Sequence, residues 1–184
     1  HAFADTEKDR HSPKYDDNLF SMMWRTKKIY ADINSQIAII EEKFTKNVPQ
    51  WEGFDKFASS WGSRIGWGIA YTAFFYFFAT AWWQWLLLPV AYMMAPIHGV
   101  IINWFAHIYG YTNFKVSDTS KNLLKFDWLL MGEAYHNNHH KHGGRANFGG
   151  IKWHEMDVTY QIMRLLDKMK LIKLNPVTAV KREH

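Results

Sequence analysis

Fifty consecutive residues, 65–114, contain no Asp, Glu, Lys or Arg. All 22 Lys and Arg and all 17 Asp and Glu lie outside this segment, in residues 1–64 or 115–184. A membrane-spanning helix needs about 20 mainly apolar residues, so the uncharged segment is long enough for two such helices. We therefore predict an all-α integral membrane protein in which residues 65–114 form a transmembrane hairpin.

The predicted hairpin has two spans, about 65–83 and 85–105. Gln84 lies between tryptophans, which are typical of the membrane surface, and we expect the chain to turn there. Pro89 and Pro96 fall inside the second span. Prolines are tolerated in membrane helices when neighbouring groups satisfy the freed carbonyls, so they predict a kink rather than a break.

The charged flanks predict how the hairpin is oriented. Ten Lys and Arg precede it and twelve follow it, which places both chain ends on the cytoplasmic face. That face borders the plasma membrane if the source is bacterial and the endoplasmic reticulum if it is eukaryotic. Residues 1–64 are then a cytoplasmic segment with an amphipathic helix over roughly 18–45. Residues 115–184 are a cytoplasmic cap that ends in a second amphipathic helix around 158–169.

Composition excludes several classes of function. The chain has no cysteine, so a disulfide framework, a thiolate zinc site and an iron–sulfur cluster are all excluded, and any metal needs nitrogen or oxygen ligands. The net charge of +5 is accompanied by no Lys/Arg-rich run and no motif that reads DNA or RNA. We predict no nucleic-acid partner and interpret the basic residues as facing the membrane or a partner.

A run of histidines, GEAYHNNHH, is the strongest indication of chemistry. If it continues a helix through the preceding LLKFDWLLMGEAY, His136, His139 and His140 fall within an arc of roughly 100°. Imidazole suits iron, copper, zinc and nickel, so the run predicts metal binding without choosing the metal. The alternative is a solvated helix end. The neighbouring membrane hairpin favours the metal.

Other polar residues extend this candidate site. Asn103 and His107 form an i, i+4 pair at the cytoplasmic end of the second span, where polar groups normally face a cavity or a site. Glu133 is placed to orient the imidazole of His136, or is a surface residue. Lys141 and Arg145, in a glycine-rich loop, are candidates for contacting an anionic head group such as the phosphates of CoA. A solvated loop is the alternative.

Three motifs in order resemble a known family. GEAYHNNHHKHGGRANF resembles the third histidine box of the acyl-CoA and acyl-lipid desaturases of the Δ9, stearoyl-CoA type. HAFADTEKDRHSP resembles the stretch that begins with the last His of their second box. NWFAHIYG resembles the end of their fourth membrane helix. The similarity extends over essentially the whole chain.

The resemblance implies a site and a reaction. The implied ligands of two non-haem iron ions are His1, His107, His136, His139 and His140, with Asn103 acting through water. Zinc is a possible substitute for iron. The implied reaction is O₂-dependent insertion of a cis double bond into a long-chain acyl-CoA or acyl-lipid held beside membrane lipid. Electrons would come from a small protein of the cytochrome b5 or ferredoxin type.

The family pattern is incomplete in this sequence. A first box, HxxxxH, the start of the second, HRxH, and the two membrane helices before them are missing, so we expect the C-terminal part of an enzyme, inactive in isolation. Arg10 stands where relatives have Pro. His11 is therefore either part of the site or an ordinary loop residue. The alternatives are a related membrane di-iron hydroxylase or alkane monooxygenase, and a non-catalytic fragment that binds partners or lipid.

Overall fold

The computed structural model describes residues 3–9, 11–35, 37–46 and 51–174. This part of the chain contains helices and three isolated β-bridges and no strand, which confirms the prediction of an all-helical fold. The chain divides into two compact units, His1–Tyr30 with His98–His184, and Ala31–Ile97, and each is described by itself.

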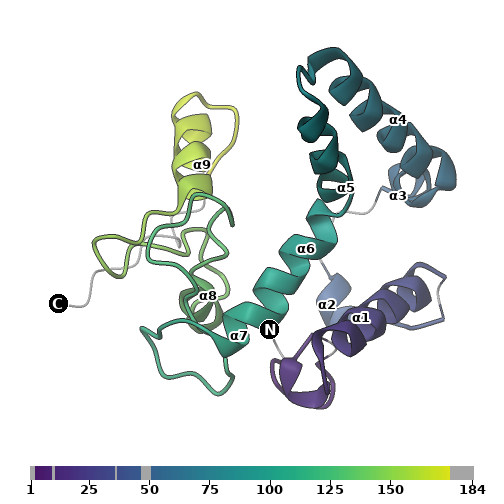
Figure 1. Ribbon diagram of the computed structural model, residues 1–184. Helices are drawn as coiled ribbons and strands as arrows, with labels where there is room; N and C mark the ends of the chain where they lie inside the picture. Colours follow the sequence, from purple (N-terminus) through teal and green to yellow (C-terminus); the bar gives the residue numbers. More distant parts are fainter. Residues whose placement is uncertain (1–2, 10, 36, 47–50, 175–184) are drawn as a thin grey trace. The chain divides into compact units, whose positions relative to one another are not determined.

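The helices are short except for α1 and α4 (Figure 1). In chain order they are η1 (Pro13–Tyr15), α1 (Leu19–Asn34), α2 (Glu42–Thr45), α3 (Glu52–Ser59), α4 (Trp61–Phe78), η2 (Trp82–Leu86), α5 (Leu87–Tyr92), α6 (Met94–Val100), the π-helical turn η3 (Ile101–Phe105), α7 (Ala106–Ile108), α8 (His136–Lys141) and α9 (Val158–Lys168).

In the unit Ala31–Ile97, α4 and α5 pack side by side (Figure 1). The turn between α4 and η2 is closed by Gln84, whose Oε1 accepts hydrogen bonds from the backbone N–H groups of Thr80 (2.6 Å) and Ala81 (2.9 Å). The hydroxyl oxygens of Thr72 and Tyr92 lie 2.6 Å apart and join the two helices. The side chains of Thr72, Gln84 and Tyr92 therefore form hydrogen bonds within this apolar segment.

The second predicted span is more strongly broken than expected. It consists of η2, α5, α6, η3 and α7, and no single described helix has the length and apolarity needed to cross a membrane. Trp82–Tyr92 and Met94–Ile108 meet that requirement only as a pair, with a bend of 62° between them. Pro96 explains the position of the bend, because its ring excludes the carbonyl of Tyr92 and it offers no N–H to that carbonyl. The chain leaves helical geometry at Met93.

The first amphipathic helix is also shorter than the predicted 18–45. α1 ends at Asn34, where the carbonyl of Asp32 accepts hydrogen bonds from the N–H groups of Ile37 and Ala38. Asn and Ser favour helix ends and the β-branched isoleucines that follow favour extended chain, so local preference opposes continuation. A separate short helix, α2, begins at Glu42.

The segment before the histidine run is a folded loop rather than the expected helix. Both carboxylate oxygens of Asp127 accept backbone hydrogen bonds, from Leu130 (2.7 Å), Gly132 (2.7 Å) and Ala134 (3.1 Å). Gly132 adopts a φ of 100°, which a helix does not allow. The helix α8 therefore starts at His136 itself.

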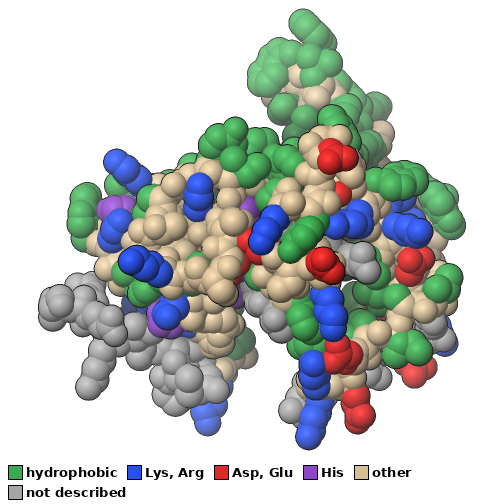
Figure 2. Space-filling model, turned by 90° about the horizontal axis from the view of Figure 1, so that it is seen from below, with side chains coloured by type: hydrophobic (Ala, Val, Ile, Leu, Met, Phe, Trp, Pro, Cys, Tyr) green, Lys and Arg blue, Asp and Glu red, His purple; other side chains and the backbone are tan. Residues whose placement is uncertain are grey.

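Large apolar side chains lie on the surface of the Ala31–Ile97 unit. Trp67 is 63% exposed, Phe77 75% and Trp82 78%. On the face seen in Figure 2, hydrophobic side chains gather in continuous groups at the surface. Continuous apolar surface of this kind usually marks a face that contacts a membrane or another protein.

Candidate metal centre

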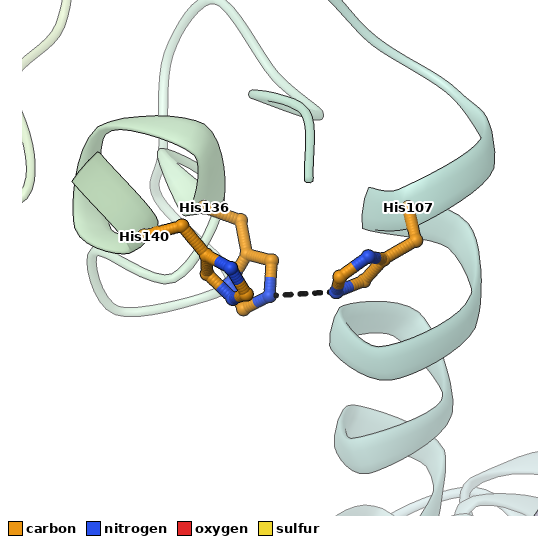
Figure 3. A group of neighbouring side chains, drawn as sticks. All are labelled: His107, His136 and His140. Carbon is orange, nitrogen blue, oxygen red and sulfur yellow. Dashed lines mark hydrogen bonds between the residues drawn. The ribbon is translucent and has the colours of Figure 1, made fainter. Parts of the chain in front are cut away.

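Three imidazoles converge in the unit that joins the two ends of the chain. One ring nitrogen from each of His107, His136 and His140 lies within 4.8 Å of the others, and the Nε2 atoms of His107 and His136 are 3.2 Å apart (Figure 3). No other group of three or more potential ligands occurs among the described residues. A cavity of about 160 Å³ adjoins the three rings.

Local structure brings His107 into this position. It follows the π-helical turn η3, a wider turn that often occurs at functional sites. Within that turn, the side-chain amide of Asn103 donates to the carbonyl of Gly99 (2.9 Å). Asn103 also lines the cavity beside His107, so the predicted i, i+4 pair does share one face.

Each clustered imidazole has a polar partner near the nitrogen that faces away from the centre. His140 Nδ1 lies 2.9 Å from Asp118 Oδ2, and His107 Nδ1 lies 3.0 Å from Thr119 Oγ1. His136 Nδ1 lies 3.7 Å from Glu133 Oε2. An outer partner that fixes the ring and raises its basicity usually accompanies metal-binding histidines. Three imidazoles, two of them with hydrogen-bond partners at Nδ1, are a donor set that fits a transition-metal ion.

Asp5 ties the beginning of the chain to this centre. Its Oδ2 accepts a hydrogen bond from the backbone of Thr119 and lies 4.0 Å from His107 Nδ1. Its Oδ1 accepts from the hydroxyl of Ser12. Asp9 and His11 line the cavity as well. The stretch that resembles the end of a second histidine box therefore lies against the residues of the third.

Protonation states favour a metal ligand at His136. Burial, followed by the neighbouring His140 and His107, lowers the pKa of His136 well below its ordinary value. The ring is therefore neutral near pH 7 and its lone pair is available. Burial acts to raise the pKa of Asp118, but hydrogen bonds from Ser120 and His140 outweigh it and the pKa is lowered. Asp118 is thus an anion beside His140.

His139 lies outside this group of three, although its ring centroid is 6.2 Å from that of His136 and 6.1 Å from that of His140. Its ring stacks on Phe148, with centroids 3.9 Å apart, and it lines a second pocket of about 540 Å³ together with Glu133. Burial lowers the pKa of His139 to about 4, so this ring is neutral too. On a helix, residue 139 lies at one edge of the predicted arc and residue 140 at the other, and the structure places their rings in different pockets.

A buried network of asparagines supports α8. Asn138 Oδ1 accepts from the side-chain amides of Asn113 (2.9 Å) and Asn122 (3.0 Å), and its Nδ2 donates to Phe148 O (2.9 Å) and Glu155 Oε2 (3.1 Å). Asn137 binds the backbone of the 114–120 loop in the same way. The oxygen and the nitrogen of the Asn138 side-chain amide each form two hydrogen bonds, so α8 and its histidines are held rigidly.

The remaining predicted residues are placed as follows. The prediction for His1 lies outside the described residues. Lys141 is exposed, whereas Arg145 is buried and lines the pocket beside His139, so the two do not form one cationic surface. Sequence reasoning did not find Asp118, Thr119 or Asp5. No periodicity or spacing marks them, and only their position next to the histidines reveals them.

Comparison with known proteins decides the family. The family profile described as "Fatty acid desaturase" matches residues 1–175. This chain belongs to the fatty acid desaturase family. Among desaturases in plants, it is 28% identical to the Delta-9 desaturase-like 5 protein of Arabidopsis thaliana, over 93% of this chain and 54% of that protein. It is 27% identical to the Delta-9 acyl-lipid desaturase 2 of the same plant, over 91% of this chain and 52% of that protein.

A bacterial desaturase is similar over a shorter region. The sn-1 stearoyl-lipid 9-desaturase of Synechocystis is 35% identical over 43% of this chain and 26% of that protein. The chain spans about half the length of the two plant desaturases above. No solved structure matches the chain.

Proposed function

We propose that this chain is part of a membrane desaturase that inserts a cis double bond into a long-chain acyl group, with an acyl-lipid as the favoured substrate. The single observation that supports it most is the convergence of His107, His136 and His140 in a member of the desaturase family, with Thr119 and Asp118 at the outer nitrogens of His107 and His140. The names of the plant and cyanobacterial relatives favour the acyl-lipid over acyl-CoA.

The proposed cofactor is a pair of non-haem iron ions. His107, His136 and His140 would hold one ion, with His1 as a further ligand and Asn103 acting through water. His139 would serve the second ion from the other edge of α8, and the other ligands of that ion would come from histidine boxes outside this sequence. When bound, iron supplies the chemistry that reduces O₂ and removes hydrogen from an unactivated methylene. Zinc is the expected contaminant after overproduction.

The residues of this chain would hold and orient the reacting groups. Asp118 and Thr119 would fix the rings of His140 and His107, and Glu133 that of His136. The reaction balances as a –CH₂–CH₂– unit, O₂, two electrons and two protons giving –CH=CH– and two water molecules. The electrons would come one at a time from a small redox protein of the cytochrome b5 or ferredoxin type.

The membrane hairpin is part of the same proposal. It is supported by the uncharged segment 65–114, the exposed aromatic side chains and the internal satisfaction of the turn by Gln84. At 1.5 Å per residue α4 is roughly 27 Å long, close to the thickness of a bilayer core, but it includes Arg64 and is not apolar enough by itself to count as a span. The kinked segment from Trp82 to Ile108 would return to the cytoplasmic face and deliver His107 there.

The test uses the full-length protein, a saturated acyl-lipid, O₂ and a reducing system, with products analysed by gas chromatography. His136→Ala should abolish the cis-unsaturated product and lower the iron content. His154→Phe is the matched control, because His154 lies outside both pockets and Phe keeps its ring contacts with Tyr111 and Phe126. A hydroxylated product would assign the protein to the hydroxylases, and normal product from His136→Ala would refute the metal centre.

A further inference from the structure

The pocket beside His139 contains a buried cation that the proposed metal chemistry does not use. Arg145 is only 8% exposed, and its Nε and Nη1 atoms are buried with no hydrogen-bond partner among the described residues. Its side chain lines the 540 Å³ pocket. A buried guanidinium with unsatisfied donors is costly unless an anion or polar ligand completes it.

A second cation lines the same pocket. Lys173 follows the end of α9, and the carboxylate of Asp167 holds the chain there by accepting a hydrogen bond from the backbone of Leu174 (2.9 Å). The Lys173 side chain is exposed, so it reaches the pocket from the solvent side. Arg145 and Lys173 come from separate loops, and the pocket brings their charges to one space.

Two carboxylates also line this pocket, and both are already engaged. Asp157 accepts hydrogen bonds from the N–H groups of Phe148 and Tyr160, each at 2.9 Å. Glu133 lies 3.7 Å from the ring of His136. Neither forms an ion pair with Arg145 within the described part of the chain. Arg145 Nε and Nη1 therefore have no hydrogen-bond acceptor among the described residues and are open to an anion that enters the pocket.

We propose that this pocket binds a phosphate group through Arg145 and Lys173. The planar guanidinium matches the oxygens of phosphate, and the ammonium adds a mobile point charge. The volume suits a phosphate together with part of the molecule that carries it. Binding of the phosphate requires neither bound metal nor desaturation, but the pocket is also lined by His139, which the proposed function assigns to the second ion.

The phosphate has two possible sources, a lipid head group or a soluble phosphate. The helix α9, which contributes Thr159 and Met163 to the pocket, exposes the apolar side chains of Ile162 and Leu165. An amphipathic helix of this kind lies readily at a membrane surface, which is where a lipid phosphate would be.

The experiment is calorimetric titration of the full-length protein in detergent with two probes, inorganic phosphate and the water-soluble dihexanoyl phosphatidic acid. Arg145→Gln should weaken binding of the preferred probe by about tenfold or more, and Lys173→Gln by a smaller factor. Arg164→Gln is the matched control, because Arg164 is exposed and outside the pocket. Metal content should stay constant in all three variants, which separates this site from the metal centre.

The results distinguish the sources and can overturn the site. Tighter binding of the phosphatidic acid assigns a lipid head group, and equal binding of both probes assigns a soluble phosphate. If Arg145→Gln does not fold, two milder variants test the site instead. Arg145→Lys keeps the positive charge, and Lys173→Gln changes an exposed residue. Absence of binding to the wild-type protein, or equal affinities for Lys173→Gln and Arg164→Gln, would overturn the proposal.

Discussion

Asp118 contacts the ring of His140 at the nitrogen that faces away from the centre, so its role can be separated from metal ligation. Its carboxylate lies 2.9 Å from the ring, and both side chains are buried. The contact spans 22 residues and links a loop to α8. An anion at this position holds the ring in one orientation and makes its other nitrogen a better donor.

Replacing Asp118 with Asn should weaken metal retention by roughly 10- to 100-fold, because the outer partner loses its charge while the size of the side chain is kept. Iron or zinc content measured against a competing chelator is the test. Asp17→Asn, at an exposed position, is the control and should behave as wild type. Equal chelator resistance in both variants would show that Asp118 does not act on the metal.

Asn138 should be one of the most sensitive positions for stability. Asn138→Ala removes four hydrogen bonds of a buried side chain, to the amides of Asn113 and Asn122, the carbonyl of Phe148 and the carboxylate of Glu155, which should cost more than about 2 kcal/mol of unfolding free energy. Asn147→Ala is the control, because among the described residues its side chain accepts a hydrogen bond only from the N–H of Gly149. Thermal unfolding in detergent compares the two variants. Similar melting temperatures would show that the hydrogen bonds of Asn138 do not stabilise the fold.

Among the elements, the connection after α7 depends most on exact backbone geometry. Gly110 has a φ of 119°, and a Cβ built there would lie 2.2 Å from the carbonyl oxygen of Asn122. This close approach allows the bridge between Tyr111 and Asn122. The bridge in turn places Asn122 under α8, where its Oδ1 accepts from the backbone of Asn137.

Gly110→Ala should therefore lower both the yield of folded protein and its metal content, since backbone must move to make room. Gly66→Ala is the matched substitution. Gly66 lies within α4 with nothing within 4 Å of the added Cβ, so this change should be neutral or stabilising by up to about 1 kcal/mol. Size-exclusion profiles and metal analysis compare the two. A well-folded, metal-loaded Gly110→Ala protein would refute the close approach.

At the scale of the whole molecule, the central proposal is that the segment 65–114 enters the membrane and returns. Single-cysteine variants at Trp82 and Lys125, both exposed, are suited to test it, and Gln84 is better left in place because it closes the turn. In sealed vesicles, a membrane-impermeant maleimide should label the two positions from opposite sides. Labelling of both from one side would contradict the hairpin.

The sequence predicted those features that depend on residues close together in the chain. The lack of charge at 65–114 and the spacing of His136 and His140 are local features, and the family they indicated is confirmed. The loop held by Asp127 and the contacts of Asp118 and Thr119 were not predicted. They depend on partners up to 114 residues away, which no periodicity encodes.

The contact between Asp5 and Thr119 joins residues 114 positions apart, and it has a consequence for biosynthesis. Closing so long a loop is slow, and it cannot begin until the ribosome has made everything in between. We expect the N-terminal stretch around Asp5 to reach the histidines only after Thr119 has been made and the apolar segment has found its place. Late arrival of this kind would leave one side of the metal centre open while the nascent chain folds.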